Sequence, residues 1–426
     1  MSDLRLCGVP HNGVIEMMIV KSARDFWKLQ SHNYKVLITR SAGSTFFMNL
    51  TNQYSSIYTT ELGADSVTLG AMSSISSVVS MIIALPAGWV SDRYDLKKVY
   101  GIGLLIQLIW ICLYAFAQDW TWILVAMLIS PFTMALMMRS QTIIISKEIK
   151  NEDRAQGFAL RSVISQILGI VAPIPAAFLA EYFSGESDAL SLQGIRPLYY
   201  IRLVGMVLIA IYVYSKLQGV PAVKRPSGSS FIKDFKDVFK EGKGLYAWIC
   251  QSAIGSVTMG VFMSFTWIYA RDRGADALTM GLMTTASTLA TIIFAIPMSR
   301  LADTKGRKFA VLLSRPARYL WFIILVFAPD PRWFIVAYFF RGISMSSNAF
   351  QTWSLELVPP EKRGRWLGVT NMINAIARIP APIVGGILFR DVNPDLIFLI
   401  PLALELFLRL PLIFKVPETL TNDVSF

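Results

Sequence analysis

Arginines inside apolar stretches are the residues of this sequence with the clearest capacity for chemistry. Nine of them lie in such stretches, and no lysine does. Arg139, Arg341 and Arg378 lie deep in their stretches. A guanidinium group binds a carboxylate or phosphate through two parallel hydrogen bonds, so these three arginines predict an anion site. The alternative is structural hydrogen bonding between neighbouring helices. The other six lie near a stretch end, where a long side chain reaches the polar boundary: Arg40, Arg161, Arg202, Arg315, Arg318 and Arg409.

Neutral polar residues accompany the deep arginines at helical spacing. Arg341 is followed by Ser344, Asn348 and Gln351, and this spacing places all four on one face of a helix. The same reasoning groups three further residues, Asn371, Asn374 and Arg378. The remaining candidate substrate-binding residues are Asn49, Asn52, Gln53 and Trp267. For the asparagines, hydrogen bonding between helices is an equal alternative.

Glu405 is the only acidic residue well inside an apolar stretch, and it is the one candidate for proton coupling. It lies four residues before Arg409, the spacing of a local ion pair. His11 and His32 precede the first stretch, and the three cysteines are isolated. No nucleophile–base pair and no metal-ligand set is visible, so we expect neither an enzyme nor a cofactor or metal.

The elements that must position these residues are membrane-spanning helices. Of the 426 residues, 54% are hydrophobic and only 16% charged, which favours a polytopic all-α membrane protein over a soluble one. Apolar runs bounded by charged or turn residues predict twelve transmembrane helices. They lie near 36–58, 67–90, 99–117, 121–145, 158–182, 197–215, 245–270, 278–299, 309–328, 332–354, 365–389 and 395–415.

Charge asymmetry predicts the orientation of these spans. About 26 lysines and arginines flank the spans on the side of the termini, and about 5 lie on the opposite side. The positive-inside rule then places both termini in the cytoplasm. The net charge of +12 is explained by these loops, so we expect the lipid bilayer of the cell membrane as a partner and no nucleic acid.

The chain repeats itself at an offset of about 211 residues, as between Gly63-Ala64-Asp65 and Gly274-Ala275-Asp276. The repeat predicts two six-helix bundles, residues 36–215 and 245–426, related by a pseudo-twofold axis along the membrane normal. Residues 1–35 form a cytoplasmic tail, and residues 216–244 a cytoplasmic linker. Each of these is expected to carry an amphipathic surface helix, near 22–29 and 231–240.

Two loops carry a family resemblance. The segments Gly88 to Lys98 and Ser299 to Lys308 resemble the Gly-x-x-x-Asp-Arg-x-Gly-Arg-Lys loop of the major facilitator superfamily (MFS). The resemblance implies the MFS fold of two pseudo-symmetric bundles, a small-molecule substrate, alternating access by rocking of the halves, and a monomer. It further implies that spans 1, 4, 7 and 10 line a central cavity. Ala381 to Gly386 looks like an element of the drug-antiporter branch, displaced from span 5 to span 11.

The resemblance also implies latches that close the cytoplasmic side. Asp92 would cap the start of span 11 and Asp303 the start of span 5, near Gly157, where helix dipoles favour a carboxylate. The remaining latch candidates are Gly88, Arg93, Lys97, Glu148, Arg307, Lys308 and Glu356, the basic ones pairing with acidic ones across the loops.

Together these features predict a secondary transporter for a small organic or inorganic anion, with a proton or counter-anion as the possible coupled ion. The rival within transporters is proton-coupled efflux of lipophilic compounds. A non-transporting membrane sensor is the remote alternative.

Overall fold

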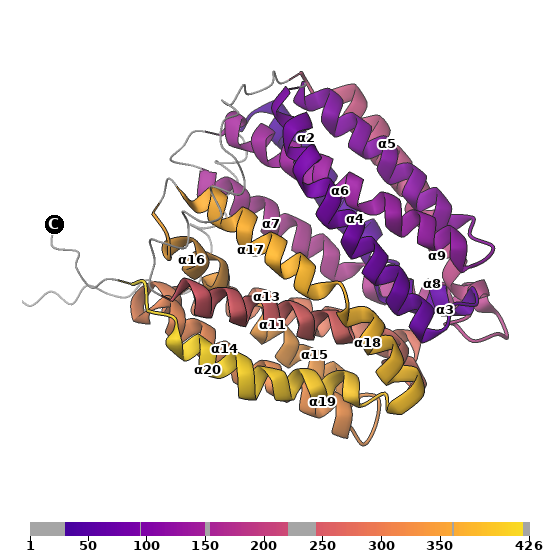
Figure 1. Cartoon of the computed structure of the whole chain (residues 1–426). Coiled ribbons are helices and arrows are strands. Elements are labelled where there is room, and N and C mark those ends of the chain that lie inside the picture. The colour runs from indigo at the N-terminus through magenta and orange to yellow at the C-terminus, as the bar shows by residue number, and fades with distance from the viewer. Residues whose placement is uncertain (1–29, 94, 150–153, 220–243, 360–361, 421–426) are drawn as a thin grey trace, which may run out of the picture.

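The computed structural model describes residues 30–93, 95–149, 154–219, 244–359 and 362–420. The two predicted amphipathic helices, near 22–29 and 231–240, lie outside these residues. All twelve predicted spans are helical (Figure 1). The first six, which we call the N-half, are α2 (His32–Asn49) with η1 (Asn52–Tyr54) and α3 (Ser55–Glu61), α4 (Ser66–Arg93), α5 (Leu96–Ala115), α6 (Trp120–Glu148), α7 (Arg154–Val171) with α8 (Pro173–Ser184), and α9 (Leu192–Lys216).

The last six spans form the C-half. They are α11 (Leu245–Met263) with α12 (Thr266–Asp272), α13 (Ala277–Lys305), α14 (Arg307–Phe327), α15 (Trp333–Ser344) with α16 (Ala349–Glu356), α17 (Arg363–Arg378) with α18 (Ala381–Ile387) and η4 (Leu388–Val392), and α19 (Leu396–Ala403) with η5 (Leu404–Arg409) and α20 (Leu410–Lys415). Within the described residues, ten helices are long and apolar enough to cross a membrane. Spans 1 and 10 are not among them.

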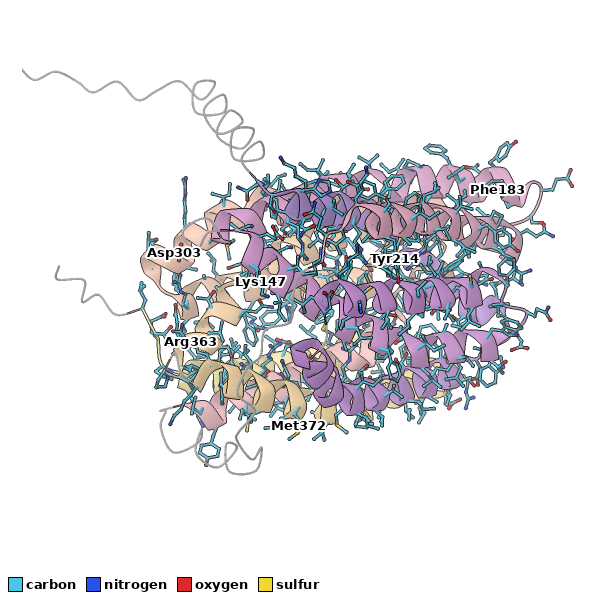
Figure 2. All side chains as sticks on the ribbon, turned by 90° about the horizontal axis from the view of Figure 1, so that it is seen from above. Lys147, Phe183, Tyr214, Asp303, Arg363 and Met372 are labelled. Atoms are coloured by element: carbon cyan, nitrogen blue, oxygen red, sulfur yellow. The ribbon has the colours of Figure 1, made fainter. Side chains whose placement is uncertain are left out.

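The two halves lie side by side, with the indigo-to-magenta N-half above the orange-to-yellow C-half in Figure 1. We call the end of the bundle near residues 30 and 420 the tail end, and the opposite end the far end. Figure 2 shows Asp303 and Arg363 at the tail end and Phe183 at the far end. Many large apolar side chains remain exposed on the outside, as a protein surrounded by lipid requires.

The repeat is visible in local structure. Asp65 and Asp276, which are repeat-related, each accept a backbone N–H bond three residues on, from Thr68 and Thr279, both at 2.8 Å. These bonds satisfy otherwise unpaired donors at the first turns of α4 and α13. Spans 1 and 7 are both interrupted, near residues 50 and 264.

Spans 5 and 11 are interrupted at repeat-related prolines. Pro173 begins α8, and Pro380 and Pro382 flank the start of α18. Proline has no N–H to donate and its ring clashes with the preceding turn, so each helix ends there and a new one begins.

The halves contact each other toward the far end. Gly70 of α4 faces the carbonyl of Pro382, and its repeat mate Gly281 of α13 faces the carbonyl of Pro173. A Cβ at these positions would come within 2.3 Å and 2.8 Å of the two carbonyl oxygens, so only glycine permits the approach. Two ion pairs add to the contact, Arg271 with Glu61 at 2.8 Å and Arg390 with Asp65 at 2.5 Å.

Candidate functional site

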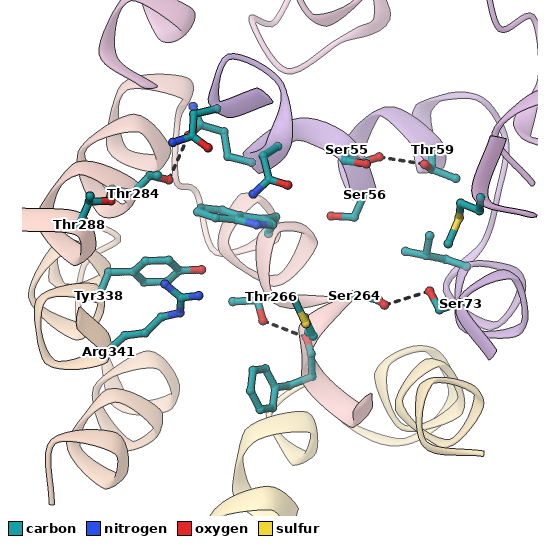
Figure 3. Close-up of a pocket in the computed structure, with 18 of the residues that line it drawn as sticks. Ser55, Ser56, Thr59, Ser73, Ser264, Thr266, Thr284, Thr288, Tyr338 and Arg341 are labelled. Carbon is teal, nitrogen blue, oxygen red and sulfur yellow. Dashed lines mark hydrogen bonds between the residues drawn. The ribbon is translucent and has the colours of Figure 1, made fainter. Parts of the chain in front are cut away.

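A cavity of about 270 Å³ lies between the two halves (Figure 3). We call it the inter-half cavity. Of the predicted substrate-binding residues, Asn49, Asn52, Gln53, Trp267 and Arg341 line it. The rest of its wall is mainly hydroxyl and aromatic: Ser55, Ser56, Thr59, Leu69, Ser73, Tyr114, Met127, Phe262, Met263, Ser264, Thr266, Thr284, Thr288, Trp321 and Tyr338.

Arg341, on α15, is the one charged residue among the described residues that line this cavity. Its Nη1 donates to the hydroxyl of Ser287 at 2.9 Å. Its guanidinium carbon lies 5.6 Å from the ring centre of Trp321 and 5.4 Å from that of Tyr338. Cation–π contacts and one hydroxyl hold the cation in place but leave its charge uncompensated by these neighbours. A guanidinium placed in this way can bind an anionic ligand.

The N-half supplies amide groups to the same cavity. Asn49 donates to the carbonyl of Gly169 at 3.0 Å, which is a contact between helices. Gln53 accepts a hydrogen bond from Thr284 at 3.0 Å, and this bond crosses between the halves. On the C-half side of the cavity, Trp267 packs on Tyr338 with ring centres 5.2 Å apart.

The sequence reasoning missed two residues of this wall and a third residue that contacts Arg341. Trp321, Tyr338 and Ser287 all contact Arg341 but were not among the candidates. Tyr338 lies three residues before Arg341, on the same helix face, and that spacing was an available signal. Trp321 belongs to span 9, which is not among the spans that the resemblance implies to line the cavity, so the sequence offered no signal for it.

The other predicted residues do not join Arg341. Asn348, Gln351, Asn374 and Arg378 line a second cavity of about 450 Å³, which we call the C-half cavity because all its lining residues belong to α11–α20. Asn374 donates to Ser252 at 2.7 Å across two helices. Asn371 is exposed and lies outside the walls of both cavities.

The separation has a physical cause. The expected single face from Arg341 to Gln351 requires a continuous helix, but span 10 is interrupted between Ser344 and Ala349. The interruption turns the second helix, α16, so that the face expected from the spacing does not exist.

The expectation that Arg315 and Arg318 extend to the polar boundary was also wrong, whereas the local pair of Arg409 with Glu405 is confirmed. They do not reach the polar boundary, because all three converge on the buried carboxylate of Glu405. Arg315 does so at 2.9 Å, Arg318 at 3.4 Å, and Arg409 through the expected local pair. Glu405 is thus surrounded by three guanidinium groups. Arg202 is buried as well, donating to Thr51 at 2.6 Å beneath Trp110.

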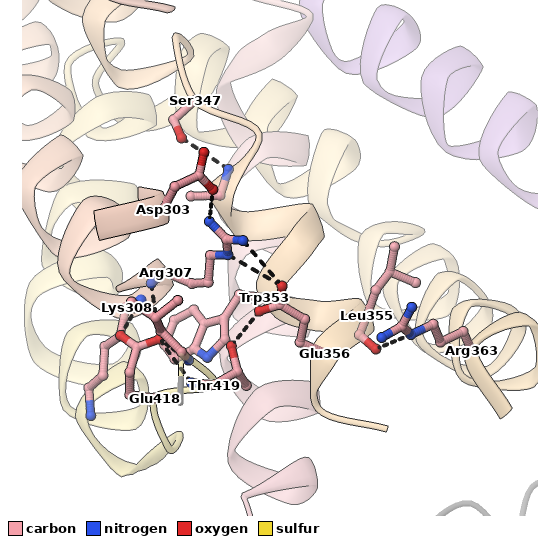
Figure 4. A network of polar contacts seen from close by, with 12 residues as sticks. Asp303, Arg307, Lys308, Ser347, Trp353, Leu355, Glu356, Arg363, Glu418 and Thr419 are labelled. Atoms are coloured by element: carbon pink, nitrogen blue, oxygen red, sulfur yellow. Dashed lines mark hydrogen bonds and ion pairs between the residues drawn. The ribbon is translucent and has the colours of Figure 1, made fainter. Parts of the chain in front are cut away.

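The latch residues lie at the tail end. Arg307 contacts Asp303 and, at 3.4 Å, Glu356, the latter being one of the pairings expected from the sequence (Figure 4). Asp303 therefore binds within its own half in this conformation rather than at α7, where the carbonyl of Gly157 accepts from Tyr34 at 2.8 Å.

The N-half latch is only partly described. Glu148 accepts from Asn33 at 2.7 Å, and the backbone N–H of Lys97 donates to Asp95 at 2.8 Å. The side chains of Asp92, Arg93 and Arg139, and the surroundings of Gly88, lie outside the described part of the structure. Their roles stay predictions.

The segment after the last helix binds the latch residues Arg307, Lys308 and Glu356. Glu418 accepts the backbone N–H groups of Arg307 and Lys308 at 3.0 and 2.9 Å, which caps the start of α14. Thr419 donates to Glu356 at 2.6 Å. We call this contact of residues 416–420 with α14 and α16 the tail clasp (Figure 4).

Comparison with known proteins identifies the family. The family model described as "Major Facilitator Superfamily" matches residues 37–269 and 247–425. The chain is 24% identical over 170 residues to the uncharacterized MFS-type transporter YxaM of Bacillus subtilis (strain 168). That alignment covers 39% of this chain and 43% of the relative, so it spans less than half the length of either protein.

Solved structures show the same fold over nearly the whole chain. The nucleoside transporter NupG superposes with a TM-score of 0.71 at 16% identity, covering 90% of this chain and 99% of NupG. A D-xylose-proton symporter superposes with a TM-score of 0.67 at 14% identity, covering 91% and 98%. The human organic anion transporter MFSD10 (TETRAN) superposes with 0.55 at 15%, covering 88% and 98%. The solved structures show the fold, and because the family model covers both halves, the chain belongs to the major facilitator superfamily and is a multi-pass membrane transporter.

Proposed function

We propose that this transporter moves a small organic anion, and that Arg341 binds the anionic group. The observation that supports the proposal is the charge of the inter-half cavity, whose described wall contains one arginine and no carboxylate. A guanidinium with no acidic neighbour in a membrane-embedded cavity favours an anionic ligand.

The rest of the wall indicates what else the substrate carries. Trp267, Trp321 and Tyr338 offer ring faces beside Arg341, and the N-half offers amides and hydroxyls. These groups suit an anion with a flat or apolar body and with hydroxyl or amide substituents. The structural neighbours named for nucleosides, a sugar and organic anions share only the fold, so the wall and not the fold supports the choice.

The proposed mechanism is alternating access, and the position of the contacts between the halves supports it. Among the described residues, hydrogen bonds and ion pairs join the halves toward the far end. With the termini in the cytoplasm, as the charge asymmetry predicts, this is a conformation in which the halves are joined on the extracellular side.

We place the protein in the cell membrane as a monomer. A proton or counter-anion as coupled ion, and Glu405 as its site, stay predictions.

The test is a binding and transport assay of the purified protein in detergent and in proteoliposomes. We expect aromatic and hydroxylated carboxylates to raise the unfolding temperature and to be taken up, because a ligand stabilises the state that it binds. Arg341→Gln should reduce both the stabilisation by these carboxylates and their uptake at least tenfold. Arg332→Gln removes the same charge at an exposed site of the same half and should change neither.

Two outcomes would contradict the proposal. Anion uptake by Arg341→Gln at the wild-type rate would mean that this arginine is structural. Stabilisation of the wild type by neutral lipophilic compounds alone would favour efflux of such compounds, which the aromatic wall also suits.

A further inference from the structure

The C-half cavity contains an excess of positive charge. Its described wall carries four arginines, Arg315, Arg318, Arg378 and Arg409, against the single acid Glu405. Arg315 is 5% exposed, Arg409 6% and Glu405 1%. Buried charges without partners are strongly destabilising, and an excess of arginines at membrane depth is especially costly. The excess therefore calls for a further negative charge that the chain itself does not supply within the described residues.

Several hydrogen-bond donors facing this region also lack partners. In the described structure, no acceptor lies within reach of the buried Nε atoms of Arg315 and Arg378. Arg318 reaches Glu405 through one nitrogen only, at the long distance of 3.4 Å. A buried donor left unpaired costs about 1–3 kcal/mol, and more when it is charged. The unpaired Nε of Arg315, a residue that is nine-tenths buried, thus indicates that a bound ligand supplies the missing acceptor.

The interruption of span 10 adds to the positive potential. Met345, Ser347 and Asn348, which interrupt the helix, line the cavity together with Ala349, the first residue of α16. The N-terminus of a helix carries a partial positive charge and unpaired N–H groups. Irregular backbone at membrane depth is tolerated where it lines a cavity.

An aromatic wall separates this cavity from the one that contains Arg341. Phe262 and Trp321 line both cavities, and their rings meet edge to face with centres 5.3 Å apart. Arg341 and the arginines around Glu405 thus line different cavities.

We propose that the C-half cavity binds an oxyanion with two negative charges, such as a dicarboxylate or a phosphate. Two charges match the excess of arginines more closely than one does. Guanidinium groups recognise paired oxygens in both chemistries. The cavity of about 450 Å³ is large enough for either ligand. This site is separate from the proposed transport site, and it involves none of the residues that bind the substrate there except the shared wall.

The experiment titrates the purified full-length protein with succinate and, separately, with inorganic phosphate in a calorimeter. Chloride and acetate at matched ionic strength are the monovalent controls. We expect at least one dianion to bind at least tenfold more tightly than either control. The tighter of the two dianions identifies the chemistry of the ligand.

Variants assign the binding to the cavity. Arg318→Gln should weaken dianion binding at least tenfold, because Arg318 is the cluster arginine held least tightly by Glu405. Ser314→Asp, which places a carboxylate in the cavity wall, should weaken it similarly and guards against misfolding of the first variant. Arg341→Gln alters the other cavity, so it should leave in place the dianion binding that depends on Arg318.

The proposal is overturned if the dianions bind the wild type no better than chloride, or if Arg318→Gln and Ser314→Asp both bind them normally. Loss of dianion binding in Arg341→Gln, with normal binding in Arg318→Gln, would assign the dianion to the inter-half cavity. That result would overturn the second site while leaving the proposed function intact.

Discussion

The two halves place an arginine and a glutamine at the same two repeat positions, but in opposite order. In the N-half, Arg40 of span 1 donates to Gln107 of span 3 at 3.1 Å. In the C-half, the residues at the same offset of 211 are Gln251 of span 7 and Arg318 of span 9. Gln251 accepts there from Arg409 at 3.2 Å instead.

The surroundings of the two positions differ much more than the positions do. In the N-half, Arg40 lies 5.6 Å from the ring centre of Tyr100 and 3.7 Å from the sulfur of Met137. The C-half adds Glu405, further arginines and a cavity. Span 4 is one continuous helix, α6, whereas span 10 is interrupted. The repeat therefore preserves the backbone arrangement, while among the described residues the Glu405 cluster and the cavity beside it belong to the C-half.

The largest effect should come from the centre of the C-half cluster. Glu405→Gln leaves three converging arginines without their carboxylate, and we expect a loss of about 3–5 kcal/mol in the free energy of unfolding. Arg40→Gln in the N-half should cost less, about 1–3 kcal/mol, because it removes one charged hydrogen bond. Denaturant unfolding in detergent compares the two. Equal losses would mean that the halves do not differ in this respect.

The next effect concerns the close approach of the halves, where the repeat is symmetrical. Gly70→Ala and Gly281→Ala should each weaken the far-end contact by about 1–3 kcal/mol, since the new methyl group meets a carbonyl oxygen. Gly70→Ala should have the greater effect because its contact is the shorter. Gly368→Ala meets no atom within 4 Å and is the matched control.

The readout is the reactivity of a cysteine placed between the halves. Ser73 lies 3.0 Å from Ser264 of the other half, so Ser73→Cys in a background without native cysteines reports opening at the far end. Reactivity should rise in both glycine variants but stay unchanged in the control. If all three variants behave alike, the glycines do not set the approach.

A smaller effect is expected for the far-end ion pairs. Both side chains of the pair Arg271 and Glu61 are about one-third exposed, at 32% and 27%, so solvent screens their attraction. A double-mutant cycle with Arg271→Gln and Glu61→Gln should give a coupling energy of about 0.2–1 kcal/mol. A coupling energy of several kcal/mol would show that the pair is a principal lock between the halves.

The smallest effect is a dependence on pH. Hydrogen bonds from Thr68, and then the guanidinium group of Arg390, hold the pKa of the Asp65 carboxyl below its usual value. The contribution of Asp65 is therefore complete above the ordinary aspartate pKa and is lost as the pH falls through the lowered one. The reactivity of the cysteine in Ser73→Cys, which reports opening at the far end, should therefore rise slightly in that acidic range. Asp65→Asn should remove the change.

The sequence was sufficient for the fold but not for the grouping of the site residues. Twelve spans, the repeat and the family could be predicted, because apolar runs and loop motifs are local features. The division of the deep arginines into two cavities could not, because Met345 to Asn348 carry no proline or glycine to mark the interruption of span 10. The convergence of Arg315 and Arg318 on Glu405 was missed for a related reason. Depth along one helix does not reveal which face turns toward Glu405 on another.

The tail clasp has a practical consequence for work with this protein. Val416 is buried in the C-half, and Glu418 and Thr419 bind the start of α14 and the latch residue Glu356. Affinity tags and fluorescent fusions are routinely joined to the carboxyl terminus of transporters. Here a deletion or a fusion junction that removes residues 416–420 would uncap α14 and release Glu356 from Thr419. Expression designs should keep the chain intact through Leu420 and attach any added sequence beyond it.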